Sequence, residues 1–265
     1  MFAHPLLDDV VALALLAGKS VMDVYARDFS VEEKEDHSPL TEADRAAHEV
    51  IVEGLKRISP QIPVLSEEET ALPDRETWGD GVYWLVDPLD GTREFVKRNG
   101  EFTVNIALIE QGVAVLGVVY APVLAWVYAA STQDGAYKKD GDGAWSPIHC
   151  AQHVAGSPWR VVGSRSHAGD SLGDFLCKLG EHEMVSMGSS LKLCLVAEGQ
   201  ADVYPRLGPT SLWDTAAAQC VVEAAGGRVV RLDGSPLSYA DTAQLLNPFF
   251  LVHGKSDLNW PSYFE

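Results

Sequence analysis

Two carboxylates close together after an apolar run are the first feature of the chain that could do chemistry. The sequence DPLDGT at 87–92 places Asp87 and Asp90 three residues apart, directly after a run typical of a buried strand. Pro88 has no N–H to donate to a β-ladder, so we expect the strand to stop there and turn both carboxylates toward one point. Hard oxygen ligands with no His or Cys nearby select Mg²⁺, Mn²⁺ or Ca²⁺ over Zn²⁺.

Two further acidic segments lie at junctions between expected elements, where folds often place active sites. One is the SEEE sequence at 66–69 after a short apolar run, and the other is Asp214 before an Ala-rich stretch. Each also has a purely structural interpretation, since SEEE is typical of a solvated helix start and Asp214 could be a helix N-cap. Asp44 has two compatible interpretations, because Thr41 and Asp44 match a capping box and a buried carboxylate there could also serve catalysis.

The end of the DPLDGT sequence adds a feature suited to an anion. Gly91 lets a ligand approach the backbone, and N–H groups exposed at such a loop can bind phosphate. A cation and a phosphate at one loop indicate phosphoryl hydrolysis, in which cations bridge the phosphate and the attacking water.

The overall charge restricts the partners. Lys and Arg number 20 against 38 Asp and Glu, a formal net charge of −18, and residues 28–80 hold fifteen acidic and five basic residues. Such a chain repels polyphosphates and anionic membrane surfaces, so a nucleic-acid polymer is not expected as a partner. An anionic substrate would need bound cations.

The expected elements place these residues in two halves. Apolar residues at helical spacing predict helices over 6–27 and 42–58. Short apolar runs predict strands at 62–65 and 82–86, and the stretches 102–109, 113–120 and 124–130 predict a meander. We therefore expect an N-terminal α+β half over 1–135. Beyond it, helices predicted at 170–179, 190–198 and 214–225 alternate with short strands in an α/β half over 136–265.

Nothing in the sequence predicts secretion or membrane insertion. The four Cys residues show no CxxC spacing and the N-terminus lacks the positive charge of a signal peptide, so reduced thiols in the cytoplasm are expected. The uncharged stretch 111–133 is long enough to span a bilayer, but Gly112, Gly117 and Pro122 interrupt it, and paired strands are the better interpretation.

Three motifs in order and spacing resemble the inositol monophosphatase superfamily. They are WLVDPLDGT at 84–92, SEEE at 66–69 and WDTAA at 213–217. The sequence at 93–109, together with SRSH at 164–167 and GSSLK at 188–192, is similar to the bacterial 3'(2'),5'-bisphosphate nucleotidases within that superfamily. The resemblance implies a layered α-β-α-β-α fold with the active site between the two halves.

The resemblance also implies two or three bound Mg²⁺ ions. Glu67, Asp87 and the Leu89 carbonyl would hold the first. Asp87, Asp90 and Asp214 would hold the second, so that Asp87 bridges both. A third, weaker ion would share Glu67.

The same resemblance assigns catalytic roles. Asp44 and Thr92 correspond to the pair that activates the attacking water, with the Thr hydroxyl passing a proton to the carboxylate. Glu68 is counted with them as a residue that positions its neighbours by hydrogen bonds, whereas Glu69 is expected on the surface. The backbone N–H groups of Gly91 and Thr92 would bind the scissile phosphate.

The second phosphate and the nucleoside need partners of their own. Ser189, Lys192 and Arg206 match the phosphate-binding positions of the subgroup, and His167 is a candidate for the ribose or adenine edge. Arg165 is a weaker candidate. The full substrate-binding set implied by the resemblance is Glu67, Leu89, Asp90, Gly91, Thr92, His167, Ser189, Lys192, Arg206 and Asp214.

The implied activity is hydrolysis of adenosine 3',5'-bisphosphate, a by-product of sulfate assimilation, to AMP and phosphate, with some action on the 5'-phosphosulfate form. Inhibition by Li⁺ and, for some members, peripheral association with the inner membrane are also implied. The oligomeric state stays open. Two alternatives remain: a phosphatase of the same superfamily acting on inositol monophosphate or a sugar phosphate, and a non-catalytic cation-binding module. Residues 28–40 are a candidate flap over the site.

Overall fold

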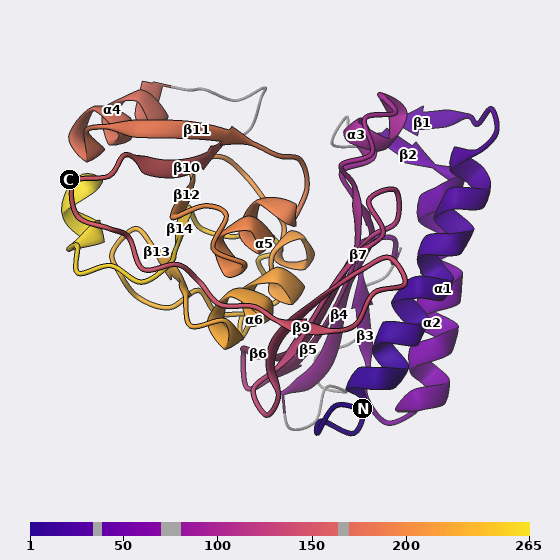
Figure 1. Ribbon diagram of the computed structural model, residues 1–265. Helices are drawn as coiled ribbons and strands as arrows, with labels where there is room; N and C mark the ends of the chain where they lie inside the picture. The colour runs from indigo at the N-terminus through magenta and orange to yellow at the C-terminus, as the bar shows by residue number, and fades with distance from the viewer. Residues whose placement is uncertain (34–38, 70–80, 164–169) are drawn as a thin grey trace.

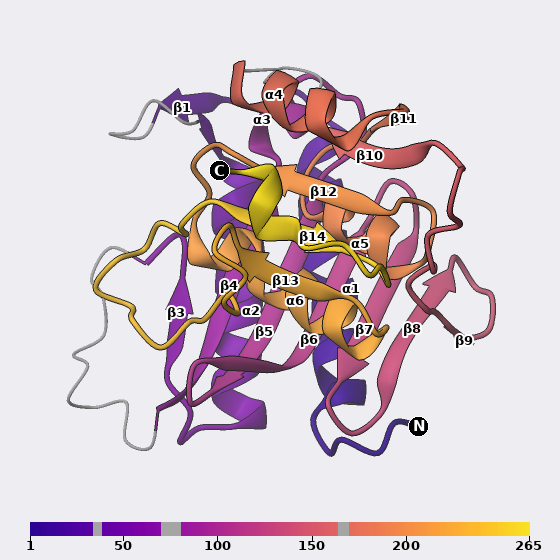
Figure 2. The ribbon, with the colours of Figure 1, turned by 90° about the vertical axis from the view of Figure 1, so that its left-hand side faces the viewer.

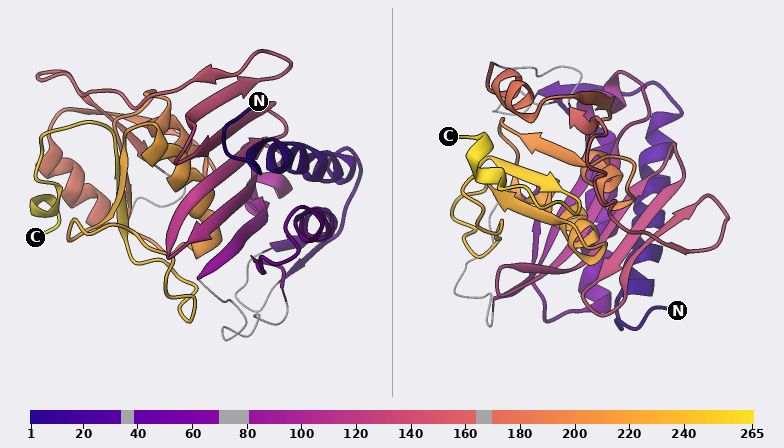
Figure 3. Two further views of the ribbon diagram at one scale, coloured as in Figure 1. Left: turned by 90° about the horizontal axis from the view of Figure 1, so that it is seen from below. Right: turned by 60° about the vertical axis from the view of Figure 1, so that its left-hand side comes forward.

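Helices and strands alternate in five layers, in the order α, β, α, β, α expected above (Figure 1). The computed structural model describes residues 1–33, 39–69, 81–163 and 170–265. Three separate clusters of buried side chains fill the spaces between the layers. Figure 3, seen from below, shows the two sheets with helices between and outside them.

The larger sheet has seven strands in the order β3-β4-β5-β6-β7-β8-β9. The pair β3 and β4 is parallel, and every other neighbouring pair in this sheet is antiparallel. Its strands are β3 (Val64–Ser66), β4 (Val82–Asp90), β5 (Thr103–Glu110), β6 (Val113–Ala121), β7 (Trp126–Ser131), β8 (Gly135–Asp140) and β9 (Ser146–Pro147). Every residue of β5 except the last is buried, because both faces of the sheet are covered.

Two antiparallel helices cover the outer face of this sheet (Figure 1). They are α1 (Leu7–Tyr25) and α2 (Glu42–Ile58), close to the predicted ranges. The residues predicted to share one side of each helix, such as Val10 and Ala17 in α1 and Ile51 and Leu55 in α2, are buried against the strands. In the chain, β1 (Val31–Glu33) and β2 (Pro39–Thr41) follow α1 and precede α2, and they pair as a separate two-stranded sheet.

The middle layer contains α5 (Leu191–Ala197) and α6 (Ala216–Ala224), with the 3₁₀ turn η2 (Leu212–Asp214) before α6. Helix α6 packs directly on the large sheet at Gly117 of β6. A Cβ atom at that glycine would overlap the carbonyl oxygen of Ala217. Only glycine allows this close approach, which packs the start of α6 on β5 and β6 of the sheet whose strand β4 carries the acidic loop.

The smaller sheet has the order β11-β10-β12-β14-β13 and lies in front of the large sheet in Figure 2. Its strands are β10 (Trp159–Gly163), β11 (His182–Ser186), β12 (Val203–Arg206), β13 (Arg228–Arg231) and β14 (Phe250–His253). Helix α4 (Asp170–Leu179) and the 3₁₀ turn η3 (Trp260–Tyr263) form the outermost layer, where Phe175 and Trp260 pack on the sheet.

Two local expectations were wrong. Strand β4 does not stop at Pro88 but continues to Asp90, with a register shift between Asp87 and Asp90 where it pairs with β5. A β-bulge of this kind leaves room in the ladder for a residue without an N–H. Asp214 is not the N-cap of α6, because Thr215 takes that position and Asp214 ends η2.

The uncharged stretch 111–133 contains the antiparallel strands β6 and β7, as predicted. None of the described helices is long and apolar enough to cross a membrane.

Candidate active site

Three carboxylates from two distant parts of the chain meet where the end of β4 contacts η2. Oxygen atoms of Asp87, Asp90 and Asp214 all lie within 4.8 Å of one another. Asp87 and Asp90 flank the bulge of β4, and Asp214 comes from η2 in the middle layer. The structure thus brings together the residues that the sequence predicted as one cation site.

Local hydrogen bonds fix the orientation of these carboxylates. The Leu89 N–H donates to Asp87 Oδ1 over 3.0 Å, so the bulge itself holds Asp87. Asp214 accepts a hydrogen bond from the Ser211 N–H over 2.9 Å, as part of a capping box at the N-terminus of η2. Gly91 follows in the left-handed region at φ 91°, where a side chain would be strained, and starts the short helix α3 (Thr92–Val96).

Glu67 lies beside this group. It follows β3, and its N–H donates to the Val86 carbonyl over 3.1 Å, which places it next to Asp87 across the parallel pair. Its carboxyl group is near enough to Asp87 to raise the pKa of that residue. Glu68 is half-buried and interacts electrostatically with Arg45, whereas Glu69 is exposed as expected.

The negative charges of this carboxylate cluster are not neutralised by the described groups around them. Burial and the neighbouring carboxylates of Glu67, Asp90 and Asp214 raise the pKa of Asp87 well above its usual range. Burial, together with Asp90 and Glu67, raises the pKa of Asp214 in the same way. A bound cation would stabilise the ionised form of these carboxylates. An all-oxygen donor set fits Mg²⁺, Mn²⁺ or Ca²⁺.

A further carboxylate, paired with a hydroxyl group, lies next to the cluster. Thr92 Oγ1 is 3.3 Å from Asp44 Oδ1 and 3.3 Å from the Leu89 carbonyl oxygen. The other oxygen of Asp44 accepts from both the N–H and the hydroxyl of Thr41, each over 2.7 Å. Asp44 therefore completes the predicted capping box of α2 while its other oxygen faces Thr92.

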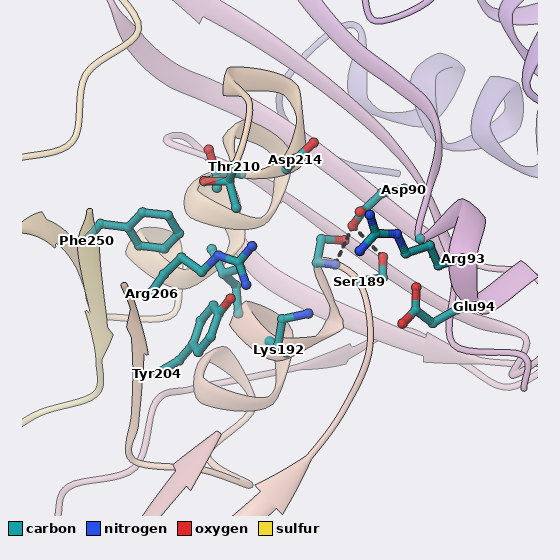
Figure 4. Close-up of a pocket in the computed structure, with 14 residues that line it drawn as sticks. Asp90, Arg93, Glu94, Ser189, Lys192, Tyr204, Arg206, Thr210, Asp214 and Phe250 are labelled. Atoms are coloured by element: carbon teal, nitrogen blue, oxygen red, sulfur yellow. Dashed lines mark hydrogen bonds between the residues drawn. The ribbon is translucent and has the colours of Figure 1, made fainter. Parts of the chain in front are cut away.

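The opposite wall of the site is basic. Figure 4 shows Lys192 of α5 and Arg206 of β12 pointing into a cavity that Asp90 and Asp214 also line. Burial lowers the pKa of Lys192 and raises that of Tyr204 to about 12. Arg206 donates to the Pro209 carbonyl over 2.7 Å, and its buried Nε has no hydrogen-bond partner among the described residues. Two cations thus stand across the cavity from the carboxylates.

Some residues of this cavity were not predicted. Glu94 of α3, Tyr204, Thr210 and Phe250 also line it. Tyr204 could have been found, because it is two residues before Arg206 on one strand and so shares its face. Phe250 carries no signal in the sequence, since β14 reaches the site only by pairing with β12.

Other predicted residues lie outside the described part of the chain. These are His167 and Arg165, and the central portion of the candidate flap at 28–40. Their roles stay predictions.

Comparisons with known proteins show the family of the chain. A model of the inositol monophosphatase family matches residues 3–255. The chain is 53% identical over 250 residues to the 3'(2'),5'-bisphosphate nucleotidase CysQ of Salmonella typhimurium, covering 93% of this chain and 99% of the relative. It is 51% identical, with the same coverage, to the protein of that name from Escherichia coli strain K12.

Solved structures show the same fold. The crystal structure of CysQ from Bacteroides thetaiotaomicron, a bacterial member of the inositol monophosphatase family, superposes with a TM-score of 0.80 at 41% identity, covering 96% of this chain and 99% of that one. An inositol monophosphatase from Thermotoga maritima gives a TM-score of 0.77 at 26% identity, covering 93% and 91%.

Proposed function

Because the chain belongs to the inositol monophosphatase family, we propose that its site hydrolyses the 3'-phosphate of adenosine 3',5'-bisphosphate to give AMP and phosphate. The observation that carries this proposal is the cavity with carboxylates on one wall and Lys192 and Arg206 on the other. A bisphosphate needs both, since one phosphate is cleaved at the cations held by the carboxylates and the other requires fixed positive partners. The 5'-phosphosulfate form has the same 3'-phosphate and also has an anionic group at the 5' position, so it is a second substrate under this proposal.

We assign the resident cation to Mg²⁺, in two or three sites. Glu67, Asp87 and the Leu89 carbonyl would hold the first ion, and Asp87, Asp90 and Asp214 the second. A third would share Glu67. When bound, Mg²⁺ neutralises charge on the phosphate and the leaving oxygen and promotes ionisation of the attacking water.

The protein's own groups would handle the proton. Thr92 Oγ1 can accept a hydrogen bond from the attacking water while it donates to Asp44, so the proton moves along this pair as the water attacks phosphorus in line. Asp44 suits the role of base because one oxygen is fixed by Thr41 and the other faces Thr92. Glu68 would support this arrangement as a positioning residue.

The phosphate would be oriented by backbone and basic side chains. The N–H groups of Gly91 and Thr92 bind the scissile phosphate in this scheme. Lys192 and Arg206 bind the remote phosphate together with the backbone N–H of Ser189, whose hydroxyl donates to Asp90, and His167 contacts the nucleoside. The half 1–135 then supplies most of the cation ligands, and the half 136–265 supplies Asp214 and the nucleotide-binding residues, although the large sheet itself continues to Pro147.

The proposed location is the cytoplasm, where nucleotide substrates are abundant. All four cysteines are free thiols in the structure, in keeping with a reducing compartment. The net charge of −18 gives no support to association with an anionic membrane surface.

The test is phosphate release from adenosine 3',5'-bisphosphate and inositol 1-phosphate, measured side by side with Mg²⁺, with a chelator, and with added Li⁺. We expect strong preference for the nucleotide, loss of activity with the chelator and inhibition by Li⁺. Preference for inositol 1-phosphate would keep the metal chemistry but remove the roles given to Lys192, Arg206, Ser189 and His167. Phosphate release that is unaffected by the chelator would overturn the metal assignment.

A further inference from the structure

Asp90 is fixed by two donors from the other half of the chain. Both the Ser189 hydroxyl and the Ser190 N–H donate to Asp90 Oδ2, each over 2.5 Å (Figure 4). Ser189 adopts a left-handed backbone at φ 56°, which is unfavourable for a serine and brings its hydroxyl to this oxygen. With Oδ2 occupied by two donors, Asp90 Oδ1 is the oxygen left to face a cation.

A buried row of hydroxyl groups continues behind Ser189. Thr103 is at the start of β5, opposite Asp90 in the strand register, and is fully buried. Its Oγ1 lies 2.6 Å from Ser189 Oγ and 2.8 Å from Ser190 Oγ. Ser190 Oγ in turn is 2.9 Å from Oδ1 of Asn105, which is 1% exposed.

Counting protons gives this row a direction. Each hydroxyl group can donate one hydrogen bond. The Ser189 hydroxyl donates to Asp90, so it accepts a hydrogen bond from the Thr103 hydroxyl. The Thr103 hydroxyl therefore donates to Ser189 and accepts a hydrogen bond from the Ser190 hydroxyl. Ser190 consequently has no proton left for Asn105, and the amide of Asn105 must donate to it.

The buried amide of Asn105 supports this count. With Oδ1 toward Ser190, its Nδ2 is buried without a partner among the described residues. Exchanging the amide oxygen and nitrogen, which have nearly the same shape, turns Nδ2 toward Ser190 Oγ and supplies the missing donor. The buried N–H group gains a partner by the same change that balances the protons.

We propose that Thr103 is a positioning residue for the cation site. The row Asn105, Ser190, Thr103, Ser189 donates in one direction and ends on Asp90 Oδ2. Thr103 is its middle member and joins the large sheet to the start of α5. The inference rests on the proposed function only in taking Asp90 as a cation ligand, and it does not depend on the nucleotide.

The experiment compares Thr103→Val, which keeps the shape and removes the hydroxyl, with Thr103→Ser, which keeps the hydroxyl. Binding of Mn²⁺ alone is measured from the electron paramagnetic resonance signal of the free ion, together with kcat and KM at saturating Mg²⁺. Thr103→Val should bind Mn²⁺ about 10-fold or more weakly, the range usual for groups that orient metal ligands. It should also lower kcat while leaving KM within about twofold. Thr103→Ser should stay within about threefold of wild type in Mn²⁺ affinity.

A double-mutant cycle separates this role from simple packing. If Thr103 acts through Ser189, adding Thr103→Val to Ser189→Ala should weaken Mn²⁺ binding much less than it does in the wild type. Equal effects in both backgrounds, wild-type Mn²⁺ binding by Thr103→Val, or an equal defect in Thr103→Ser would each overturn the proposal. Should Thr103→Val fail to fold, Ser189→Ala alone tests the last link, and wild-type Mn²⁺ binding by it would also overturn the proposal. Absence of nucleotidase activity in the wild type would contradict the proposed function and leave the Mn²⁺ comparison intact.

Discussion

The Thr92 hydroxyl lies 3.3 Å from Asp44 Oδ1, although 48 residues separate the two in the chain. Thr92 begins α3 after the acidic loop, and Asp44 lies in the first turn of α2 on the outer layer. The other oxygen of Asp44 caps α2 through Thr41. One buried carboxylate therefore joins a helix terminus to the site, so its structural and proposed catalytic roles can be separated by mutation.

We expect Asp44→Asn to lower kcat by about 10²-fold or more, the range of a general base, because an amide cannot accept the proton. The amide oxygen can still accept from Thr41, so the free energy of unfolding should change by less than about 1 kcal/mol. Thr92→Ala should lower kcat similarly, and Thr92→Ser, which keeps the hydroxyl, should retain most activity. Steady-state kinetics and urea unfolding check both. A large loss of stability with little loss of kcat in Asp44→Asn would show that Asp44 only caps the helix.

Sequence spacing was enough to predict the helices α1 and α2, the meander and the three acidic segments. These features depend on local patterns, namely helical spacing, alternation and the residues that end elements. The bulge at Pro88 was missed because whether proline ends a strand or sits in a bulge depends on the partner strand β5. The row from Asn105 to Ser189 was also missed, because it depends on how β5 meets α5 and leaves no local signal.

The charges of Asp87 and Asp214 should make the metal-free protein sensitive to pH. Their pKa values are raised by folding, so the folded state binds more protons than the unfolded state above the unfolded pKa. In chelator, the stability they provide when protonated is therefore present at low pH and is lost as the pH rises through their folded pKa values. A pKa that is higher by one in the folded state than in the unfolded state corresponds to about 1.4 kcal/mol. Thermal unfolding between pH 5 and 8, with chelator and with Mg²⁺, measures the effect, which Mg²⁺ should reduce.

Replacing the most buried of these carboxylates should stabilise the metal-free protein. Asp87→Asn removes the charge and keeps an oxygen to accept from the Leu89 N–H. At pH 8 in chelator we expect the free energy of unfolding to rise by about 1 kcal/mol or more, and Mg²⁺ to give no further stabilisation. Asp142→Asn, at an exposed position, is the matched control and should change stability by less than about 0.5 kcal/mol. A destabilised Asp87→Asn would contradict the charge argument.

Lys192 should give the affinity for the bisphosphate a pH dependence. Burial lowers its pKa, so its positive charge is lost at a lower pH than for an ordinary lysine. The KM for adenosine 3',5'-bisphosphate should then increase between pH 7.5 and 9.5, and Lys192→Arg should flatten the change because arginine stays charged. Tyr204 beside it, with a pKa of about 12, does not titrate in this range. Lys192→Met should raise KM at pH 7.5 about 10-fold or more and have little effect on inositol 1-phosphate. An equal effect on both substrates would remove Lys192 from the recognition of the remote phosphate.

The contact between β6 and α6 should prove essential for both stability and the site. Gly117→Ala would drive a Cβ atom into the Ala217 carbonyl oxygen, and a backbone atom in a helix packed on the sheet cannot move aside cheaply. We expect a loss of about 1–3 kcal/mol in the free energy of unfolding, measured by urea unfolding. Gly173→Ala in α4 is the control, because a Cβ there meets nothing within 4 Å and the helix gains from the change, by up to about 1 kcal/mol. Since α6 begins just after Asp214, the displacement should also weaken Mn²⁺ binding in the Gly117→Ala protein. If Gly117→Ala binds Mn²⁺ as tightly as the wild type, the close packing of α6 on β6 does not position Asp214.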